Sequence, residues 1–322
     1  MTLFVIMDLA LLGIPIGIVF LYFGSKWMVD GAKMIAIIMG ISPFVIGLTV
    51  LAFGSSAPEA FTSIVSRDAP QLIIGNVVGS NIVNLGVAIG LAAILSPLFC
   101  SFKETKLELG FMVLSGLMVY AMALTGMIGL GFGLILVASI FIFVYIVYRL
   151  KRNGDGAKAA NDEKETVDWP LWKCILLTVF GLAVLYFGSE FFVAGAKVAA
   201  GMLGVSDLLI GLIVVAVGTS LPEICICLMA AYRGETDMAI SNIVGSNIFN
   251  CFFVLGIGAC LADVPILDSV LTFHLPVMMV MTLIMCAFLY KNDRVGRYAG
   301  AVLFAIYVAY VTLLAFNPSL TM

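Results

Sequence analysis

Charged residues are scarce in this sequence. Asp, Glu, Lys and Arg make up 11% of its 322 residues, against about 25% in an ordinary soluble protein. Histidine occurs once, at position 274, and the seven cysteines are scattered mostly within apolar segments, without a paired framework. The low charge excludes a soluble globular domain. The pattern of Cys and His excludes a soft-metal site, so we expect the cysteines to act as small hydrophobic residues.

Long apolar runs fill almost the whole chain. Hydrophobic residues make up 63% of the sequence, and the mean hydropathy is +1.19. A helix of roughly 17 to 25 apolar residues crosses about 30 Å of hydrocarbon. We predict an all-α integral membrane protein with a lipid bilayer as its surroundings, no nucleic acid or obligate protein partner, no enzymatic activity and no cofactor. Its ten predicted transmembrane helices are 8–26, 42–66, 72–96, 107–125, 128–149, 170–189, 206–231, 238–262, 270–290 and 296–316.

The distribution of basic residues predicts the orientation of these helices. No Lys or Arg precedes the first segment, which carries Asp8 near its start. We therefore expect a retained helix rather than a cleaved signal peptide. With the N-terminus outside, 14 of the 16 Lys and Arg residues fall on the cytoplasmic side, and only Arg67 and Lys197 fall outside. Because cytoplasmic loops are enriched in basic residues, an even number of helices then predicts that both termini face the exterior.

The chain consists of two similar halves. Residues 21–59 align without gaps to residues 185–223 at a constant offset of 164, with 21 identities in 39 positions. The motif GNVVGSNIVN (75–84) then matches SNIVGSNIFN (241–250) at an offset of 166. We predict a first five-helix repeat over 1–150, a cytoplasmic polar linker over 151–168, and a second repeat over 169–322. Five helices per repeat invert the second half, and inverted repeats place a substrate site at the bilayer midplane, between the halves.

Each half interrupts an apolar segment with a proline and a glutamate. These are the stretches GSSAPE, which ends at Glu59, and GTSLPE, which ends at Glu223. A carboxylate near the centre of a spanning helix costs at least about 2.5–3.5 kcal/mol and almost always faces a partner or a polar cavity. Because no Lys or Arg lies inside these segments, we expect protons or bound cations to be that partner. The alternative is a permanently protonated glutamic acid held by a neighbouring hydroxyl group.

The residues around the two glutamates are rich in oxygen. Pro58 and Pro222 remove the helical hydrogen bonds to the carbonyls of Gly54 and Gly218, and distortion of the adjoining turn would free two alanine carbonyls as well. In the GSN motifs, a Ser and an Asn stand four residues apart and share one helix face; their alternative role is interhelical hydrogen bonding. An all-oxygen set suits hard cations such as Ca²⁺. The expected contributors are Ala52, Ala216, Ser55, Ser56, Thr219, Ser220, Ser80, Asn84, Ser246 and Asn250.

The paired motifs GLTVLAFGSSAPE…GNVVGSNIVN and GLIVVAVGTSLPE…SNIVGSNIFN resemble the two alpha-repeats of the Na⁺/Ca²⁺ exchanger family, within the cation/Ca²⁺ antiporter superfamily. The resemblance implies that Glu59 and Glu223 ligate Ca²⁺ and Na⁺, the transported ions. It further implies oxygen ligands from the side chains of Ser55, Ser56, Thr219, Ser220, Ser80 and Ser246, from the carbonyls of Ala52 and Ala216, and from Asn84 and Asn250 at the centre.

The sequence departs from the family pattern at four positions. Ser55 stands where the family often has Thr, Ala57 where it often has Leu, and Ser241 replaces a glycine. Asn250 stands where some relatives have Asp, which leaves the charge of the site, and hence ion selectivity and stoichiometry, open. Similar K⁺-dependent exchangers use Asp in the second repeat, so a K⁺ requirement is not predicted.

The function predicted from these features is secondary antiport of Ca²⁺ against Na⁺ by alternating access, in the inner membrane of a prokaryotic cell. The expected moving part is the first and sixth segments. A Ca²⁺/H⁺ antiporter is the first alternative, although such relatives tend to carry a further Glu in the GSN motif. A passive cation channel is the second. His274 is expected at the surface or the membrane interface, with a proton-relay role as the alternative.

Overall fold

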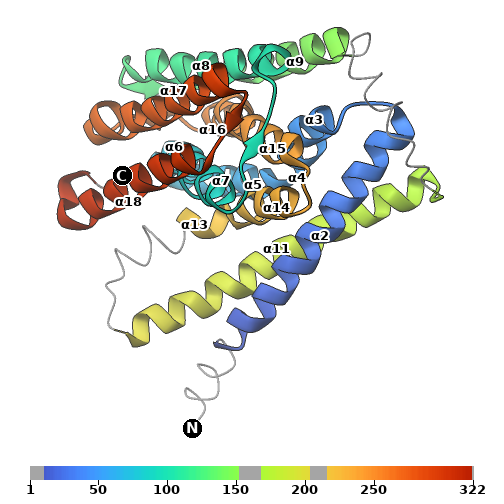
Figure 1. The fold of residues 1–322 in the computed structure, drawn as a ribbon. Helices are drawn as coiled ribbons and strands as arrows, with labels where there is room; N and C mark the ends of the chain where they lie inside the picture. Colours follow the sequence, from blue (N-terminus) through green and yellow to red (C-terminus); the bar gives the residue numbers. More distant parts are fainter. Residues whose placement is uncertain (1–10, 152–167, 204–215, 321–322) are drawn as a thin grey trace.

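The computed structural model describes residues 11–151, 168–203 and 216–320, and this part of the chain is almost wholly helical (Figure 1). Short π-helical or 3-10 turns, labelled η, interrupt several of the helices. The first half contains α2 (Gly13–Met39), α3 (Pro43–Ile46), η1 (Gly47–Leu51), α4 (Ala52–Ser55), α5 (Ala57–Val65), η2 (Ser66–Asp68), α6 (Gln71–Val83), η3 (Asn84–Ile89), α7 (Gly90–Leu95), α8 (Phe102–Ala123) and α9 (Leu130–Lys151).

The second half repeats this order in the part that is described. It contains α11 (Leu171–Met202), α13 (Ala216–Thr219), α14 (Leu221–Tyr232), α15 (Thr236–Phe249), η5 (Asn250–Val254), α16 (Leu255–Leu261), η6 (Val270–His274), α17 (Leu275–Asn292), α18 (Arg297–Phe316) and η7 (Pro318–Leu320). The predicted linker, 151–168, lies almost entirely outside the described residues and stays a prediction.

Four two-residue strands join loops of the two halves. β1 (Leu98–Phe99) pairs antiparallel with β4 (Arg294–Val295), and β2 (Met127–Ile128) pairs antiparallel with β3 (Val264–Pro265). Each pair therefore takes one strand from each half. β1 and β3 occupy equivalent loops of the two halves, as do β2 and β4, so the two pairings are related by the internal repeat.

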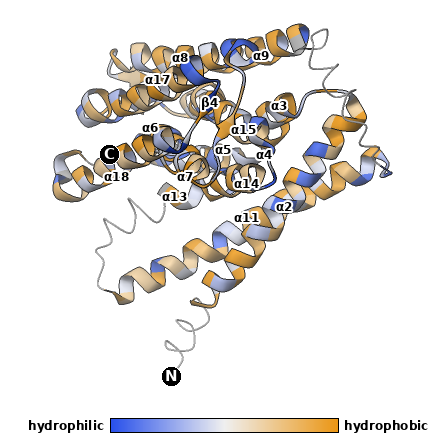
Figure 2. Ribbon diagram, in the orientation of Figure 1, coloured by the Kyte–Doolittle hydropathy of each residue, from blue (hydrophilic) through white to orange (hydrophobic). Residues whose placement is uncertain are grey.

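Eight helical stretches in the described residues are long and apolar enough to cross a membrane. Except at the end of α11, they agree closely with the predicted segments, and Figure 2 shows that they consist largely of hydrophobic residues. The stretches α6–α7 and α15–α16 are the most buried, whereas α9, α11 and α18 are the most exposed. The GSN motifs therefore lie at the centre of the protein. The predicted seventh segment is described only from Ala216 onward, as α13 and the shorter apolar helix α14.

The predicted end of the sixth segment, at residue 189, is wrong, because α11 continues to Met202. The predicted end of the first segment, at residue 26, is wrong as well. Helix α2 continues to Met39, beyond the charged residues Asp30 and Lys33. Both charges have partners on another element: Arg233 lies 3.2 Å from Asp30, and Glu235 lies 2.9 Å from Lys33. Because these contacts are made between elements far apart in the sequence, hydropathy along α2 could not reveal them.

Helices α2 and α11 cross each other beside the remaining helices (Figure 1). The crossing is built from glycines on both helices, and a Cβ atom at Gly24 would lie 2.6 Å from the backbone nitrogen of Leu185. A Cβ atom at Gly181 would lie 2.6 Å from the backbone nitrogen of Met28. Since small residues let membrane helices approach closely, the two backbones are in direct contact here. The contacts Gly17 with Gly188 and Gly31 with Thr178 show that the helices run antiparallel.

The prediction that His274 lies at the surface or interface is wrong, because its side chain is fully buried. One ring nitrogen is 2.8 Å from the hydroxyl oxygen of Tyr310, and the other is 2.7 Å from the carbonyl oxygen of Leu320. The helix begins at Val270, one turn before His274, and α18 with the segment after it covers the ring. The histidine joins the C-terminal segment to α17.

We therefore expect Tyr310→Phe to lower the free energy of unfolding by about 1 kcal/mol, the usual net contribution of one hydrogen bond. Thermal unfolding of the purified protein measures this change. Ion transport should stay unchanged, because the two ring nitrogens of His274 are engaged by Tyr310 and Leu320 and not by the glutamates. A strong loss of transport without a loss of stability would instead favour the proton-relay alternative.

Candidate cation site

Both glutamates lie in the first turn of a helix that restarts after a break. The break is at Ser56 in the first half, with φ −86° and ψ 5°, and at Ser220 in the second, with φ −90° and ψ 6°. Pro58 and Pro222 follow, where a missing N–H is tolerated because the first helical N–H groups have no partner. The positive end of each helix dipole therefore lies close to a carboxylate. Glu59 and Glu223 are both fully buried.

The two breaks face each other across the halves. The Ser56 hydroxyl donates to Oε1 of Glu223 at 2.9 Å. The hydroxyl oxygens of Ser55 and Ser246 are 3.4 Å apart. Glu59 and Glu223 are near enough to interact electrostatically. Residues from both halves therefore come together, as the predicted site requires.

Several oxygens in this cluster are buried but have no hydrogen-bond partner among the residues that the structure describes. They are Oε1 and Oε2 of Glu59, Oε2 of Glu223, Oγ of Ser80, Oγ of Ser220, Oδ1 of Asn84 and Oδ1 of Asn250. An unsatisfied buried polar group costs about 1–3 kcal/mol, and more when it is charged. Native proteins keep few such groups. A bound cation would satisfy them together, since Ca²⁺ takes 6–8 oxygen ligands.

The carbonyl of Ala52 differs from the expectation. The carbonyl of Ala52 is not freed by the proline, because it accepts the backbone N–H of Ser56 at 3.1 Å. The hydroxyl of Ser55 also lies 3.4 Å from this carbonyl oxygen. Helix α4 therefore stays hydrogen-bonded from Ala52 up to the break at Ser56. Cation ligation by Ala52 stays a prediction, as does that by Ala216, which begins α13 directly after residues outside the description.

Thr219 is half-buried and borders a small cavity of about 150 Å³. Pro58 and Pro222 line the same cavity, together with Glu190 and Lys197 of α11. This cavity therefore lies beside both helix breaks and has a partly polar lining, as an ion entrance needs.

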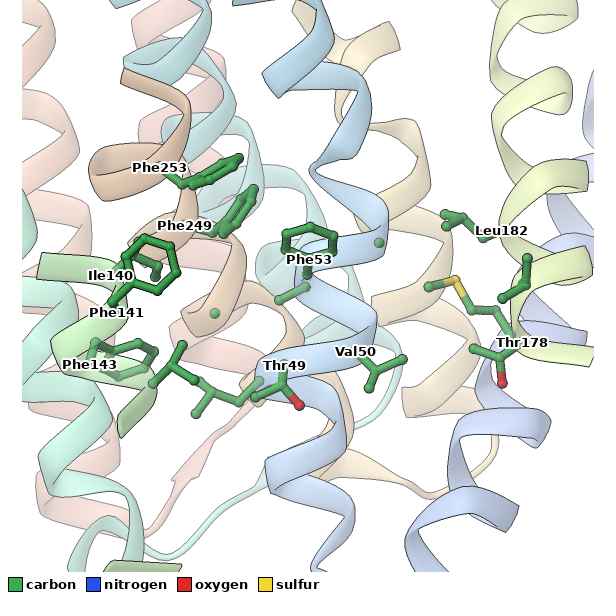
Figure 3. A pocket seen from close by; sticks show the side chains of 17 residues that line it. Thr49, Val50, Phe53, Ile140, Phe141, Phe143, Thr178, Leu182, Phe249 and Phe253 are labelled. Carbon is green, nitrogen blue, oxygen red and sulfur yellow. The ribbon is translucent and has the colours of Figure 1, made fainter. Parts of the chain in front are cut away.

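A larger cavity of about 540 Å³ has the opposite character (Figure 3). Phe53, Phe249 and Phe253 form its aromatic wall, and Thr178 and Leu182 of α11 lie on the other side. The rings of Phe249 and Phe253 stack with centroids 4.6 Å apart. Because its lining is almost entirely apolar, it offers little to a cation. The cavity lies between this aromatic wall and α11.

The two ion pairs of α2 join this helix to a loop of the second half. Arg233 and Glu235 belong to the connection between α14 and α15, and α2 packs directly against α14. The equivalents of Asp30 and Glu235 in the other half are Ala194 and Ala69. The two ion pairs therefore have no counterpart at the repeat-related position.

Sequence reasoning missed two residues of the central network. Asn84 Nδ2 donates to Oδ1 of Asn247 at 3.0 Å, and Asn250 Nδ2 donates to Oδ1 of Asn81 at 3.2 Å. The two hydrogen bonds are related by the offset of 166. A signal for Asn81 and Asn247 was present, because each stands three residues before the predicted Asn and therefore shares its helix face.

The π-helical turns were also not predicted. η3 begins at Asn84 and η5 begins at Asn250, at equivalent points of the two halves. Such turns are rare and occur frequently at functional sites. They widen the helix where the two asparagines meet their partners.

Buried carboxylates and unpartnered oxygens between two broken membrane helices define a site of a multi-pass ion transporter. The family profile described as "Sodium/calcium exchanger protein" matches residues 9–150 and 173–316. This chain belongs to the sodium/calcium exchanger family and is a cation/Ca²⁺ antiporter.

Individual relatives match over nearly the full length. The sodium/calcium exchanger MaX1 of Methanosarcina acetivorans is 31% identical, over 93% of this chain and 96% of the relative. An uncharacterized membrane protein of Methanocaldococcus jannaschii, MJ0091, is 35% identical, over 91% of this chain and 94% of the relative. A solved structure of the sodium-calcium exchanger NCX_Mj, soaked with Na⁺ and Sr²⁺, superposes with a TM-score of 0.82 at 31% identity, over 95% of this chain and 99% of that one.

Proposed function

We propose that this protein exchanges Ca²⁺ for Na⁺ at a site between its two halves, near the bilayer midplane. The observation that carries the proposal is the cluster of buried oxygens that have no hydrogen-bond partner in the described part of the chain, which includes three of the four carboxylate oxygens of Glu59 and Glu223. The relative MaX1 and the structural neighbour NCX_Mj are both named as sodium/calcium exchangers. Ca²⁺ and Na⁺ are then transported substrates, and no resident cofactor is needed.

The proposed architecture is ten transmembrane helices in two inverted repeats. Eight spans are long and apolar enough by themselves, and α2 and the α13–α14 segment supply the other two. The antiparallel crossing of α2 with α11 supports the inversion, as do the exchanged strand pairs and the reciprocal asparagine hydrogen bonds.

Two carboxylates explain why loading and crossing are coupled. Together they carry about two negative charges, which one Ca²⁺ or several Na⁺ can neutralise. Exposing an unneutralised pair to a low-dielectric barrier is costly, because charges buried without partners are strongly disfavoured. The transition between outward and inward access is therefore favoured only when cations occupy the site. Since Ca²⁺ and Na⁺ compete for the same oxygens, one kind of ion crosses at a time.

A cavity on the predicted outer side and ion pairs on the predicted cytoplasmic side support the proposal that the structure is in an outward-open state. The cavity beside Pro58 and Thr219 includes Lys197, which the charge distribution places outside. The ion pairs of Asp30 and Lys33 lie at the predicted cytoplasmic side, where α2 packs on α14. Alternating access would open this second contact while the cavity closes. The α2–α11 pair is the proposed moving part, because it stands beside the core (Figure 1).

A flux experiment with two gradients tests the proposed coupling. Purified protein in proteoliposomes should take up ⁴⁵Ca²⁺ when an outward Na⁺ gradient is imposed, and not when a pH gradient alone is imposed. Uptake that follows only the pH gradient would establish Ca²⁺/H⁺ antiport instead. Uptake that needs neither counter-ion and does not saturate would establish a channel. Empty liposomes control for leakage.

The proposed location is the inner membrane of a prokaryotic cell, with both termini outside. The support is the predominance of Lys and Arg on the side that holds the two ion pairs. A short tag at either end should therefore be accessible to a membrane-impermeant label in intact spheroplasts. Accessibility only after permeabilisation would reverse the orientation.

A further inference from the structure

The orientation of the Asn81 amide group is fixed by its surroundings. Its Nδ2 lies 3.3 Å from the carbonyl oxygen of Asn247, 3.1 Å from Sγ of Cys251 and 3.6 Å from Sδ of Met278. A carbonyl oxygen accepts hydrogen bonds and cannot donate them. The amino group of Asn81 must therefore point toward Asn247, and its oxygen must point the other way. The side chain is 2% exposed, so no bulk water competes.

This fixed oxygen determines the orientation of Asn250. Nδ2 of Asn250 donates to Oδ1 of Asn81 at 3.2 Å. Rotating the Asn250 amide by half a turn would set its oxygen against the oxygen of Asn81, and two acceptors repel. Oδ1 of Asn250 consequently points away from Asn81, and it is one of the buried oxygens that find no partner within residues 11–151, 168–203 and 216–320.

We propose that Asn81 is a positioning residue that turns Asn250 so that an oxygen, and not an amino group, is presented to the transported cation. The same contact selects a neutral side chain at position 250, because an aspartate there would place a carboxylate oxygen beside Oδ1 of Asn81. The net charge of the site then comes from the two glutamates. This inference rests on the proposed function, since it assigns a role within the same cation site.

The first test compares Ca²⁺ binding by the unaltered protein and by Asn81→Leu, which has a similar shape but no amide. One buried hydrogen bond contributes about 0.5–1.5 kcal/mol, so we expect the Kd for Ca²⁺ to rise by a factor of about 2 to 10. The probe is ⁴⁵Ca²⁺ in equilibrium dialysis of the purified protein in Na⁺-free buffer. In flux assays the KM should rise while kcat changes little. An unchanged Kd would overturn the inference.

The second test asks whether Asn81 acts through Asn250. In the Asn250→Asp background the two carboxylate oxygens are equivalent. An oxygen therefore faces the cation in either orientation of the side chain, and Asn81 is not needed to orient it. Adding Asn81→Leu there should leave the Kd unchanged or lower it, because the opposed oxygen is removed. An equal rise of the Kd in both backgrounds would show a merely structural role, since independent effects add.

A third variant, Asn81→Asp, tests the inference if Asn81→Leu does not fold. Asn81→Asp retains an acceptor for Nδ2 of Asn250, so it should bind Ca²⁺ at least as tightly as the unaltered protein. Its other oxygen faces the carbonyl oxygen of Asn247, so the folded protein should itself be less stable. Combined with Asn250→Asp, it opposes two carboxylates and should lower the stability of the Ca²⁺-free protein. Equal effects of Asn81→Asp in the two backgrounds would contradict the inference.

Thr282→Val is the matched control for loss of a buried polar group. The Thr282 hydroxyl donates to the carbonyl of Met278 at 2.8 Å, on the helix that also supplies the sulfur near Asn81. Its Kd for Ca²⁺ should not change. No Ca²⁺ binding by the unaltered protein would overturn both the proposed function and this inference, whereas Ca²⁺ binding without Na⁺-driven flux would overturn the Na⁺ coupling alone.

Discussion

Glu59→Gln and Glu223→Gln are each expected to abolish Na⁺-driven Ca²⁺ uptake. Each change keeps the shape of the side chain but removes one negative charge from a fully buried position. At about 4 Å and an effective dielectric constant near 20, one unit charge contributes about 4 kcal/mol toward a monovalent cation. Removing one carboxylate also relieves its repulsion with the other, so we expect a smaller net loss, about a hundredfold or more in affinity.

The two variants should also lose the stabilisation that Ca²⁺ gives to the folded protein. A ligand at about 100 times its Kd stabilises a folded protein by about 2.7 kcal/mol. The unaltered protein should therefore unfold at a higher temperature in Ca²⁺ than in chelator. The Gln variants should show little difference, and in chelator they should be at least as stable as the unaltered protein, because a buried unpaired charge has been removed.

Asp268→Asn is the matched control, because it neutralises an exposed carboxylate near the start of η6. Its Ca²⁺ uptake and its thermal shift should both equal those of the unaltered protein. Full transport by both glutamate variants would remove these residues from the mechanism. Transport lost only in Glu59→Gln would show that the Ser56 hydrogen bond keeps Glu223 from acting as an ion ligand.

The sequence predicted the helical segments well because hydropathy reports directly on which stretches enter a membrane. It located the two glutamates as well, because a charge and a proline within an apolar run are local anomalies. The end of α2 was wrong for a different reason. Asp30 and Lys33 lie within the helix, and their partners Arg233 and Glu235 are far away in the chain, so the apolar run alone does not mark where the helix ends.

The asparagine network shows the same limit within the site. The stretches GSNIVN (79–84) and GSNIFN (245–250) each contain two asparagines, and spacing alone gives no reason to choose between them. The structure separates their roles, since Asn84 and Asn250 keep an unpartnered oxygen while the oxygens of Asn81 and Asn247 accept hydrogen bonds. Likewise, whether the carbonyl of Ala52 is hydrogen-bonded depends on the backbone conformation at Ser56, and no residue pattern in the sequence reveals that conformation. His274 was misplaced because α18 and the following segment, which bury it, are distant in sequence.

The second large effect is expected at the crossing of α2 and α11, where Gly24→Ala and Gly181→Ala should each destabilise the protein. An added Cβ atom would lie 2.6 Å from a backbone nitrogen of the facing helix in both cases. Backbone cannot move aside as a flexible side chain can, so the helices must separate. Overpacking of this kind costs about 1–3 kcal/mol. Thermal unfolding in detergent measures the loss.

Gly110→Ala provides the matched control within a membrane helix. No heavy atom would lie within 4 Å of a Cβ atom at Gly110, and alanine favours helix over glycine by about 1 kcal/mol. This variant should therefore be as stable as the unaltered protein or more stable. Equal destabilisation by Gly110→Ala would attribute the effect to helix flexibility and not to the crossing.

The double variant Gly24→Ala with Gly181→Ala distinguishes one shared contact from two independent ones. The carbonyl oxygen of Gly181 lies 2.9 Å from the Cβ position of Gly24, and that of Gly24 lies 2.8 Å from the Cβ position of Gly181. Once the first methyl group has separated the helices, the second finds space, so the combined loss should be less than the sum. Because the α2–α11 pair is the proposed moving part, a wider crossing should also slow Ca²⁺ uptake while leaving Ca²⁺ binding intact. Weaker binding in proportion to slower uptake would instead place this crossing within the cation site.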